Sequence, residues 1–236
     1  MMKIRTVVCV AAVGAALAAA GCGSSVTNAE VTAAASTVGN LTHEYVLSRG
    51  SLEDFLGGPS LEPVGGGHLS SGAYVFGPGE GPTLTGALSS GETYSIEVIF
   101  RFASVDGYRR ILEQKQPRVD NGWYVLDGTF DYYDNQRSPH DIAQGPQGAI
   151  QVNQDVDVVI TRDGSTNEVA CYANGVLQYS FIDTTGSSTF DASGNEIEFF
   201  NDNGGENSAG VLHTVRIFDA ALDQAEVSDL FARSGL

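Results

Sequence analysis

Residues 156–181 read VDVVITRDGSTNEVACYANGVLQYSF, a stretch that predicts three consecutive β-strands joined by tight turns. Val156, Val158 and Ile160 recur at every second position, which is the period of a strand with one buried face. The pair Asn174-Gly175 predicts a type I′ hairpin turn, because both central residues of that turn need a positive φ angle. The last strand is therefore expected to return beside the one before it.

The rest of the chain repeats this alternation. The clearest further strand is Tyr94–Phe102, whose apolar residues fall at alternate positions and share one face. Further strands are predicted at residues 43–47, 73–76, 110–114, 123–126, 129–133, 196–200 and 211–218, turns at Asp106-Gly107, Asn121-Gly122, Asp127-Gly128 and Asp163-Gly164, and a surface loop at 134–147.

One helix is predicted near the C-terminus. Asp223 and Glu226 form a capping box there, in which each side chain accepts a hydrogen bond from a backbone N–H of the first turn. Val227 and Leu230 then face inward at helical spacing. About a dozen strands with one short C-terminal helix indicate an all-β fold of two packed antiparallel sheets.

Composition restricts the partners. The chain has 236 residues, of which 42% are hydrophobic, enough for one domain with a full core. Its formal charge is −17, and loss of residues 1–22 would remove Lys3, Arg5 and no carboxylate, giving −19. So acidic a surface argues against nucleic acid and anionic membranes as partners.

The first 22 residues have the features of a secretory signal peptide: a positive start, an apolar segment at 7–17 and small residues before Cys22. Ala19-Ala20-Gly21-Cys22 resembles a bacterial lipobox, in which the cysteine is lipidated after cleavage, although Ala19 stands where leucine is usual. Residues 23–40 then read as a flexible tether and 41–236 as the folded domain. An exported protein is expected, held in the cell membrane by a lipid on Cys22 or freely secreted after plain cleavage.

A series of segments, in this order, resembles laminin-G-like, concanavalin A-like domains of bacterial exported proteins. The segments are YSIEVIFRF (94–102), RILEQ (110–114), DNGWYV (120–125), VVITRDG (158–164), VACYANGVL (169–177), EFFNDN (198–203) and GVLHTVRIFDAALDQAEV (210–227). The resemblance covers residues 41–236 and implies a jelly-roll sandwich of two antiparallel sheets. Members of that superfamily include sugar-binding lectins, adhesion modules and glycosidases, and the fold alone does not choose among them.

No catalytic residue is predicted. Glucanases of this fold carry the pattern E-x-D-x-x-E on one strand, and the nearest match here places Glu196 and Glu198 with Asn201 where the third acid belongs. The expectation is therefore a non-catalytic protein, with these two glutamates solvated on the outside and Ile197 and Phe199 turned inward.

Calcium is the cofactor that the sequence favours. Asn201, Asp202 and Glu206 offer oxygen ligands in a glycine-containing loop, and Asp120 could lie nearby because the rim loops of a jelly roll gather at one end. An acidic turn without a metal is the alternative.

A sugar site needs an exposed aromatic platform with polar neighbours. Trp123, Tyr132 and Tyr133 are the candidates, beside Asp131 and Asn135. Because Tyr132 and Tyr133 are consecutive in a strand, one of them must face outward. The alternative is that the outer tyrosine only covers a sheet face.

Three functions remain open. The first is a lectin-like module that binds carbohydrate, and the second is an adhesion or scaffold domain that binds an extracellular protein and has no sugar site. The third is a glycosidase-like enzyme. Membrane contact is expected only through the lipid on Cys22. Cys171 alternates with Ala170 and Tyr172 in a strand, so a buried free thiol is expected there.

Overall fold

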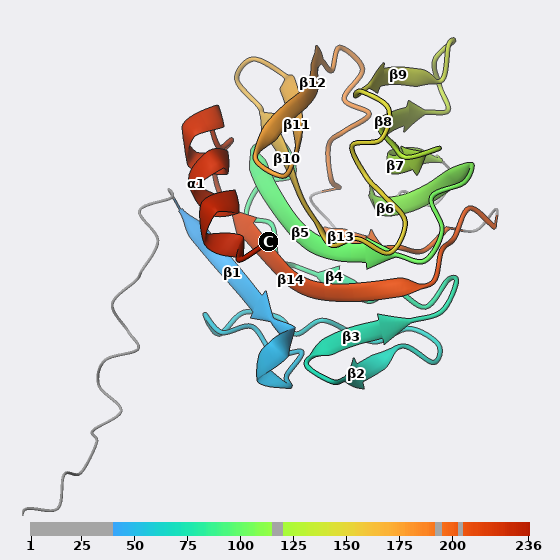
Figure 1. Cartoon of the computed structure of the whole chain (residues 1–236). Coiled ribbons are helices and arrows are strands. Elements are labelled where there is room, and N and C mark those ends of the chain that lie inside the picture. Colours follow the sequence, from blue (N-terminus) through green and yellow to red (C-terminus); the bar gives the residue numbers. More distant parts are fainter. Residues whose placement is uncertain (1–39, 115–119, 192–194, 203–204) are drawn as a thin grey trace, which may run out of the picture. The chain divides into compact units, whose positions relative to one another are not determined.

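The computed structural model describes residues 40–114, 120–191, 195–202 and 205–236 (Figure 1). In chain order its elements are β1 (Leu41–Val46), the 3₁₀ turn η1 (Leu47–Arg49), β2 (His68–Ser70), β3 (Ala73–Phe76), β4 (Thr83–Thr85), β5 (Tyr94–Phe102), β6 (Tyr108–Gln114), β7 (Asn121–Leu126), β8 (Thr129–Asp134), β9 (Asp141–Gln144), β10 (Val156–Asp163), β11 (Glu168–Ala173), β12 (Val176–Ile182), β13 (Glu196–Phe199), β14 (Gly210–Phe218) and α1 (Gln224–Ser234).

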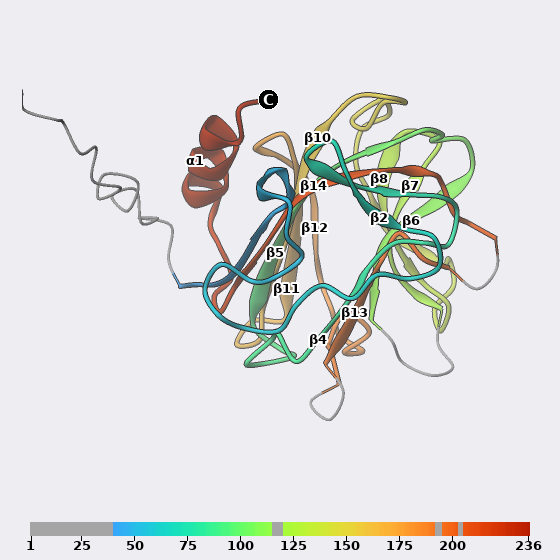
Figure 2. The same cartoon turned by 90° about the horizontal axis from the view of Figure 1, so that it is seen from below.

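The strands form two antiparallel sheets, as the sequence predicts. Sheet A has eight strands in the order β12-β11-β10-β5-β14-β3-β2, with β1 paired to β14, and sheet B has six in the order β4-β13-β6-β7-β8-β9. Figures 1 and 2 show β6–β9 of sheet B on one side of β5 and β14, and α1 on the other. Consecutive strands pair in β10–β12 and in β6–β9, whereas β5, β13 and β14 pair with strands distant in the chain, so some connections carry the chain from one layer to the other.

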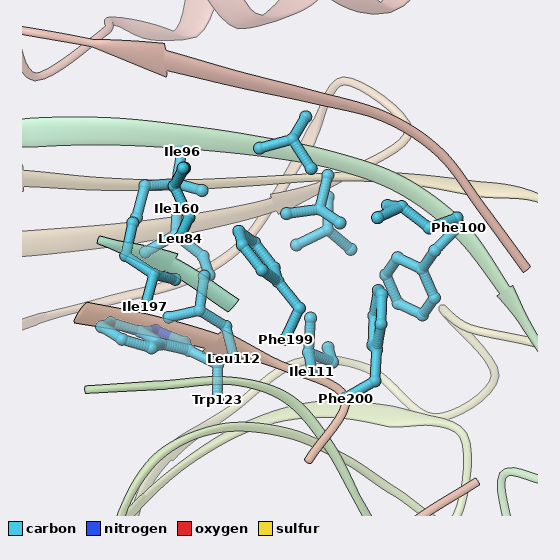
Figure 3. Packing of buried hydrophobic residues seen from close by; sticks show 14 of the residues in the cluster. Leu84, Ile96, Phe100, Ile111, Leu112, Trp123, Ile160, Ile197, Phe199 and Phe200 are labelled. Atoms are coloured by element: carbon cyan, nitrogen blue, oxygen red, sulfur yellow. The ribbon is translucent and has the colours of Figure 1, made fainter. Parts of the chain in front are cut away.

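The core fills the space between the sheets. Figure 3 shows Ile96, Phe100 and Ile160 of sheet A pointing toward side chains of sheet B, among them Trp123 and Phe199. Each large apolar side chain that is fully buried in this way contributes about 1.5–3 kcal/mol. This packing fixes which face of every strand is internal, and therefore which side chains reach the outside of each sheet.

Residues 156–181 fold as predicted. Strands β10, β11 and β12 are consecutive antiparallel neighbours, and Asn174 and Gly175 have φ angles of 50° and 74°, the positive values of a type I′ turn. Asp127 and Gly128, with φ angles of 49° and 82°, form the same kind of turn between β7 and β8. The asparagine and the aspartate accept left-handed backbone angles more readily than most residues do.

Other local predictions are wrong. Asn121-Gly122 is not a turn, because both residues lie in β7 and pair with Asp134 and Tyr133. By contrast, Asp163-Gly164 does open a turn as predicted: the chain reverses over residues 164–167, and the Asn167 N–H donates a 2.7 Å hydrogen bond to the Asp163 carbonyl. The predicted loop at 134–147 contains β9, and the short strands β2 and β4 carry too few residues for a visible period.

Helix α1 covers the outer face of sheet A. Its N-terminus has the predicted capping box, with Asp223 accepting bonds from two backbone N–H groups and Glu226 accepting one from Asp223. Val227 and Leu230 pack against outward-facing side chains of β10, β11 and β14, which are Val159, Ala170, Tyr172 and Phe218. Among the described residues, sheet B has no helix of this kind on its outer face (Figure 1).

The predicted signal peptide, the lipidation site Cys22 and nearly all of the 23–40 tether lie outside the described residues. Within the described ranges, no helix combines the length and the apolar composition needed to cross a bilayer. Cys171 is a buried free thiol, as predicted, and burial raises its pKa to about 12.

Candidate functional site

Polar and aromatic side chains that do not point into the core lie together on the outer face of sheet B. Trp123 of β7 is in the core, so Tyr124 points outward, and Tyr132 of β8 is in the core, so Asp131 and Tyr133 point outward. Strand register then sets Arg110, Tyr124, Asp131 and Gln144 side by side, one on each of the four strands β6, β7, β8 and β9.

Three tyrosines form a mutual cluster on this face. The ring centroids of Tyr108, Tyr124 and Tyr133 lie 5.5, 5.8 and 6.0 Å apart in pairs, with interplanar angles of 75–77°. Edge-to-face rings at such distances attract each other beyond their shared burial. The Tyr108 hydroxyl donates a 2.7 Å hydrogen bond to Asp141, and the His140 imidazole lies 5.4 Å from the Tyr133 ring.

The three rings differ in exposure. Tyr124 is fully buried, whereas Tyr108 and Tyr133 are partly exposed. Two tyrosine rings are thus presented to solvent and held in place by a third. We call this surface, with Tyr108, Tyr124, Tyr133 and the carboxyl groups around them, the tyrosine face.

Arg110 stands at the centre of the acidic part of the tyrosine face. Its Nη2 contacts one carboxylate oxygen each of Glu113 at 3.0 Å, Asp202 at 2.8 Å and Asp120 at short range. The Arg110 side chain has no exposed surface. A guanidinium pairs well with several carboxylates because its donors point in fixed directions, and removing it would leave buried charges uncompensated.

The local backbone is shaped around Arg110. Its Nη1 donates a 2.9 Å bond to the Asn121 carbonyl, and its guanidinium carbon lies 4.0 Å from the centroid of the Tyr124 ring. A side chain at position 122 would overlap Nη1 of Arg110, so Gly122 is required by this close approach. This is the physical reason why an Asn-Gly pair here lies within a strand instead of a turn.

Two glutamates face each other across β6 and β13. Glu113 and Glu198 are opposite partners in the register, and both are nearly buried. Burial and the adjacent Glu198 carboxyl raise the pKa of Glu113 to about 8, against the opposing effect of Arg110. The expectation of a solvated Glu198 is therefore wrong, while Ile197 and Phe199 do face the core as expected.

Asp131 is an unusual group on the same face. It is fully buried, and among the described residues no donor meets ordinary hydrogen-bond distance and angle at either carboxylate oxygen, although the Gln144 side chain acts on it as a weaker donor. Burial and the neighbouring Asp141 raise the pKa of Asp131 to about 7, while Gln144 opposes the rise. A buried acceptor without a close donor is unfavourable, so this carboxyl gains from any donor brought to it. Its oxygens have no exposed surface, so a ligand reaches them only when the side chains that cover them move.

One of the three rings of the predicted aromatic platform is partly exposed. Trp123 and Tyr132 have no exposed surface, so the prediction that either presents a ring to a ligand is wrong. Their positions opposite each other on β7 and β8 place both in the core, 5.0 Å apart. Tyr133 is the outward-facing tyrosine of the consecutive pair. Asn135 is exposed at the end of β8, where its backbone N–H donates to the Asn121 side chain.

Sequence reasoning missed Tyr108, Tyr124 and Arg110. The alternation that buries Trp123 could have indicated Tyr124, because adjacent residues of a strand face opposite sides. Tyr108 and Arg110 depend on the register between β6 and β7, which contains an irregularity after Arg110. That irregularity leaves no simple trace in the sequence pattern.

The acidic residues predicted to bind calcium come together only in part. Asp120 and Asp202 converge as expected, and together with Glu113 they form a group whose oxygens lie within 4.8 Å of one another. Glu206 is close to Asp202, since its backbone N–H donates to that carboxylate. The Asn201 side chain instead lies near Gly79.

A calcium ion does not fit this group as it stands. The guanidinium of Arg110 already contacts the carboxylate oxygens of Glu113, Asp120 and Asp202 that would coordinate the ion. Two cations in that position would repel each other, and calcium requires six to eight oxygen ligands. Arg110 therefore supplies the positive charge that these carboxylates need.

The outer face of sheet A has a cavity of about 390 Å³ beside the end of α1. The described cations around it already have carboxylate partners: Arg216 pairs with Glu44 and Glu97, and His213 with Asp155. Because these donors are engaged within the fold, this cavity is a weaker candidate than the tyrosine face.

The fold and this face can be compared with known proteins. A family model described as the concanavalin A-like lectin/glucanases superfamily, Laminin_G_3, matches residues 76–228. The chain belongs to this superfamily. The predicted resemblance is therefore confirmed. None of the curated proteins matches the chain significantly.

Several solved structures share the jelly roll of this superfamily member. Domain 4 of the extracellular arabinanase AbnA from Geobacillus stearothermophilus, in complex with arabinotriose, matches with a TM-score of 0.64 and 20% identity, covering 81% of this chain and 98% of that one. The botulinum neurotoxin serotype D ligand-binding domain, in complex with N-acetylneuraminic acid, matches with a TM-score of 0.60 and 14% identity. The match covers 83% of this chain and 51% of the toxin chain. The sialidase of Trypanosoma rangeli, in complex with 2,3-difluorosialic acid, matches with a TM-score of 0.62 and 11% identity. The match covers 84% of this chain and 33% of the sialidase chain.

These identities establish a shared fold and no more. The chain spans nearly all of the arabinanase domain, but 51% of the toxin domain and 33% of the sialidase. Binding domains of botulinum neurotoxins recur among the similar structures. Fold does not transfer a ligand or an activity, which depends on the residues of the site.

Proposed function

We propose that this protein is an exported, lipid-anchored, non-catalytic module of the cell envelope that binds carbohydrate on the tyrosine face. The observation that carries the proposal is the pair of partly exposed rings, Tyr108 and Tyr133, braced by buried Tyr124 and surrounded by hydrogen-bonding groups. Rigid aromatic surface with a few fixed polar groups is what small-molecule sites commonly offer.

The comparisons support a carbohydrate as the ligand. Two members of the structural neighbourhood hold a sugar chain or a sialic acid in their solved structures, namely the arabinanase domain and the toxin domain. The tyrosine face carries groups that suit sugar hydroxyls. The carboxylates of Asp141 and Asp120 and the Tyr108 hydroxyl can accept hydrogen bonds from them, and the Tyr133 hydroxyl can accept or donate one.

The carboxyl geometry favours binding over catalysis. Glycosidases of this type need two carboxyl groups about 5–9.5 Å apart, so that a water or a sugar carbon fits between them. Glu113 and Glu198 instead face each other directly across adjacent strands, and Glu198 raises the pKa of Glu113 through a hydrogen bond. Paired in this way, they leave no room for a reacting sugar.

The test is binding to a panel of immobilised oligosaccharides, followed by titration calorimetry with the best of them. Tyr133→Ala and Tyr108→Ala should each weaken binding by about tenfold or more, as loss of an aromatic contact worth 1–3 kcal/mol predicts. Phe55→Ala, which removes an exposed ring elsewhere, is the matched control and should bind normally. Unchanged affinity in both tyrosine variants would place the ligand elsewhere.

Export and lipidation are supported by the sequence of residues 1–22 alone. The full chain, expressed in a bacterial host with labelled palmitate, should carry the label in the membrane fraction, and Cys22→Ser should lose it. Unlabelled protein in the medium would instead favour plain cleavage and free secretion.

An adhesion or scaffold role is the second candidate, and one observation favours it. Strand β12 is an edge of sheet A, and it exposes Val176, Leu177 and Ile182 by 61%, 45% and 52%. Exposed apolar residues on an edge strand suit contact with another protein. Leu177→Asp should abolish such binding and leave glycan binding unchanged.

A further inference from the structure

The tyrosine face is acidic. Seven carboxyl groups of the described residues surround its rings or the adjacent Arg110, and they are Glu113, Asp120, Asp131, Asp141, Glu198, Asp202 and Glu206. With Arg110 as their cation and histidine taken as neutral, the formal excess is six negative charges. Protons retained by Glu113 and Asp131, whose pKa values are raised to about 8 and 7, lower it to about four near pH 7.

Other cations of the sequence do not reverse this sign. Arg109 of β6 pairs in register with the core residue Val125, so it points to the opposite side of the sheet from the rings. Lys115 and Arg118 lie outside the described residues, and Arg137 follows β8. Even if these last three were added, carboxylates would remain in excess. The hydroxyl of Tyr133 also lies in a negative electrostatic potential. Its pKa is raised by burial and then by Asp120 and other nearby carboxylates.

The described guanidinium on this face cannot serve an acidic ligand. Arg110 has no exposed surface and already contacts three carboxylates. A ligand carboxylate would find no free cation there and would be repelled by Asp120, whose side chain is 47% exposed. Like charges brought together in a partly desolvated site are strongly unfavourable.

A second observation points to a ligand that donates. Asp131 is fully buried, and among the described residues no donor lies at ordinary hydrogen-bond distance and angle from either oxygen, although the Gln144 side chain acts on it as a weaker donor. Its side chain points to the side that carries the rings, since Phe130 and Tyr132 beside it point into the core. Such a carboxyl gains most from a hydrogen-bond donor, and most of all from a positively charged one.

From this geometry we infer that the tyrosine face selects glycans with free amino groups, binds neutral glycans more weakly and rejects acidic ones. This inference rests on the proposed function and adds the ligand class. An ammonium group is attracted to the face of a tyrosine ring as well as to a carboxylate, so Tyr133 and Asp141 would act on it together.

The experiment compares three oligosaccharides of equal length on the full domain near pH 7: a glucosamine oligomer, its N-acetylated neutral counterpart and a galacturonate oligomer. The amine is mostly protonated at that pH. We expect the glucosamine oligomer to bind at least about tenfold more tightly than the neutral one, with the difference shrinking at high salt, and the galacturonate not to bind.

Matched variants separate the face from the charge of the whole chain. Asp141→Asn with Glu206→Gln should bring the ratio of amine to neutral affinity close to one, whatever its effect on neutral binding, because each amide keeps a hydrogen-bonding oxygen and loses the charge. Glu53→Gln with Glu168→Gln removes the same charge at exposed positions elsewhere and should leave the preference unchanged. Equal effects of the two double variants would show non-specific attraction and overturn the inference.

Other results are equally decisive. Binding of galacturonate, or equal affinity for amine and neutral oligomers, would overturn the charge selection while leaving the proposed function intact. Failure of all three oligomers, and of the wider panel, would overturn the proposed function itself. Binding of oligolysine without any glycan would replace both by an interface for basic peptides.

Discussion

Arg110 shows how a single residue organises a surface. It joins β6 to the loop after β13 through Asp202, to the start of β7 through Asp120, and to the ring of Tyr124. These partners lie as far as 92 positions apart in sequence. A lysine could not replace it, because one ammonium group lacks the several directed donors and the planar surface that stacks on tyrosine.

Replacing Arg110 tests this role. Arg110→Met leaves Glu113, Asp120 and Asp202 without a cation, and we expect the free energy of unfolding to fall by about 3–5 kcal/mol, measured by urea titration of Trp123 fluorescence. Arg101→Met, which removes a 37% exposed side chain from its 3.4 Å pair with Asp155, should cost less than about 1 kcal/mol. Similar losses in the two variants would contradict a special role for Arg110.

The same variant tests the calcium interpretation. Calcium should leave the melting temperature of the unmodified protein unchanged, and should raise that of Arg110→Met, because the emptied position is lined by three carboxylates. A rise in the unmodified protein, reversed by chelator, would show that the ion binds with Arg110 in place.

At the scale of elements, the sequence predicted correctly those features that depend on side chains a few residues apart. The capping box of α1 and the type I′ turn between β11 and β12 follow from side chains close in sequence. Helix α1 matters to the whole sandwich because it covers Val159, Tyr172 and Phe218 on sheet A.

The cap of α1 has a measurable value. Asp223→Ala removes the acceptor for the N–H groups of Ala225 and Glu226, and we expect the free energy of unfolding to fall by about 1 kcal/mol. Asp229→Ala in the same helix is the control, since Asp229 is exposed and lies 3.7 Å from Arg233 in a weak pair. An unchanged stability of Asp223→Ala would mean that packing alone holds the helix.

At the scale of the whole molecule, the buried acids set the pH dependence. Burial raises the pKa of Glu113 and Asp157 to about 8 and that of Asp131 to about 7, from the ordinary values of 4.5 for Glu and 3.8 for Asp. Between those values the folded chain holds more protons than the unfolded chain, so its stability falls as pH rises. Asp54 and Asp183 have lowered pKa values and act oppositely, losing their contribution as pH falls below about 4.

We therefore expect a stability maximum near pH 5 and a melting temperature at least about 5 °C lower at pH 8. Asp157→Asn should gain stability relative to the unmodified protein as pH rises, by about 1–2 kcal/mol more at pH 8 than at pH 5, because the amide cannot acquire the unfavourable charge. Glu53→Gln, at an exposed position, should show no such difference. A profile that rises steadily to pH 8 would contradict these assignments.

The sequence by itself determined the long strands, the helix and the fold family, but not the short strands β2, β4 and β9. Alternation in β5 and β10, the Asn174-Gly175 turn and the cap at Asp223 depend on neighbours a few residues away, so they can be read directly from the chain. Burial of Cys171 followed from the same alternation.

Only the tertiary structure decided the candidate site. Alternation states that Tyr132 and Tyr133 face opposite sides, but which side is the core depends on how the two sheets pack. The meeting of Arg110 with Asp202 and the row that joins Tyr124 to Asp131 depend on strand register, which long-range contacts fix. A surface assembled from five strands and a rim loop is therefore absent from any short segment of the sequence.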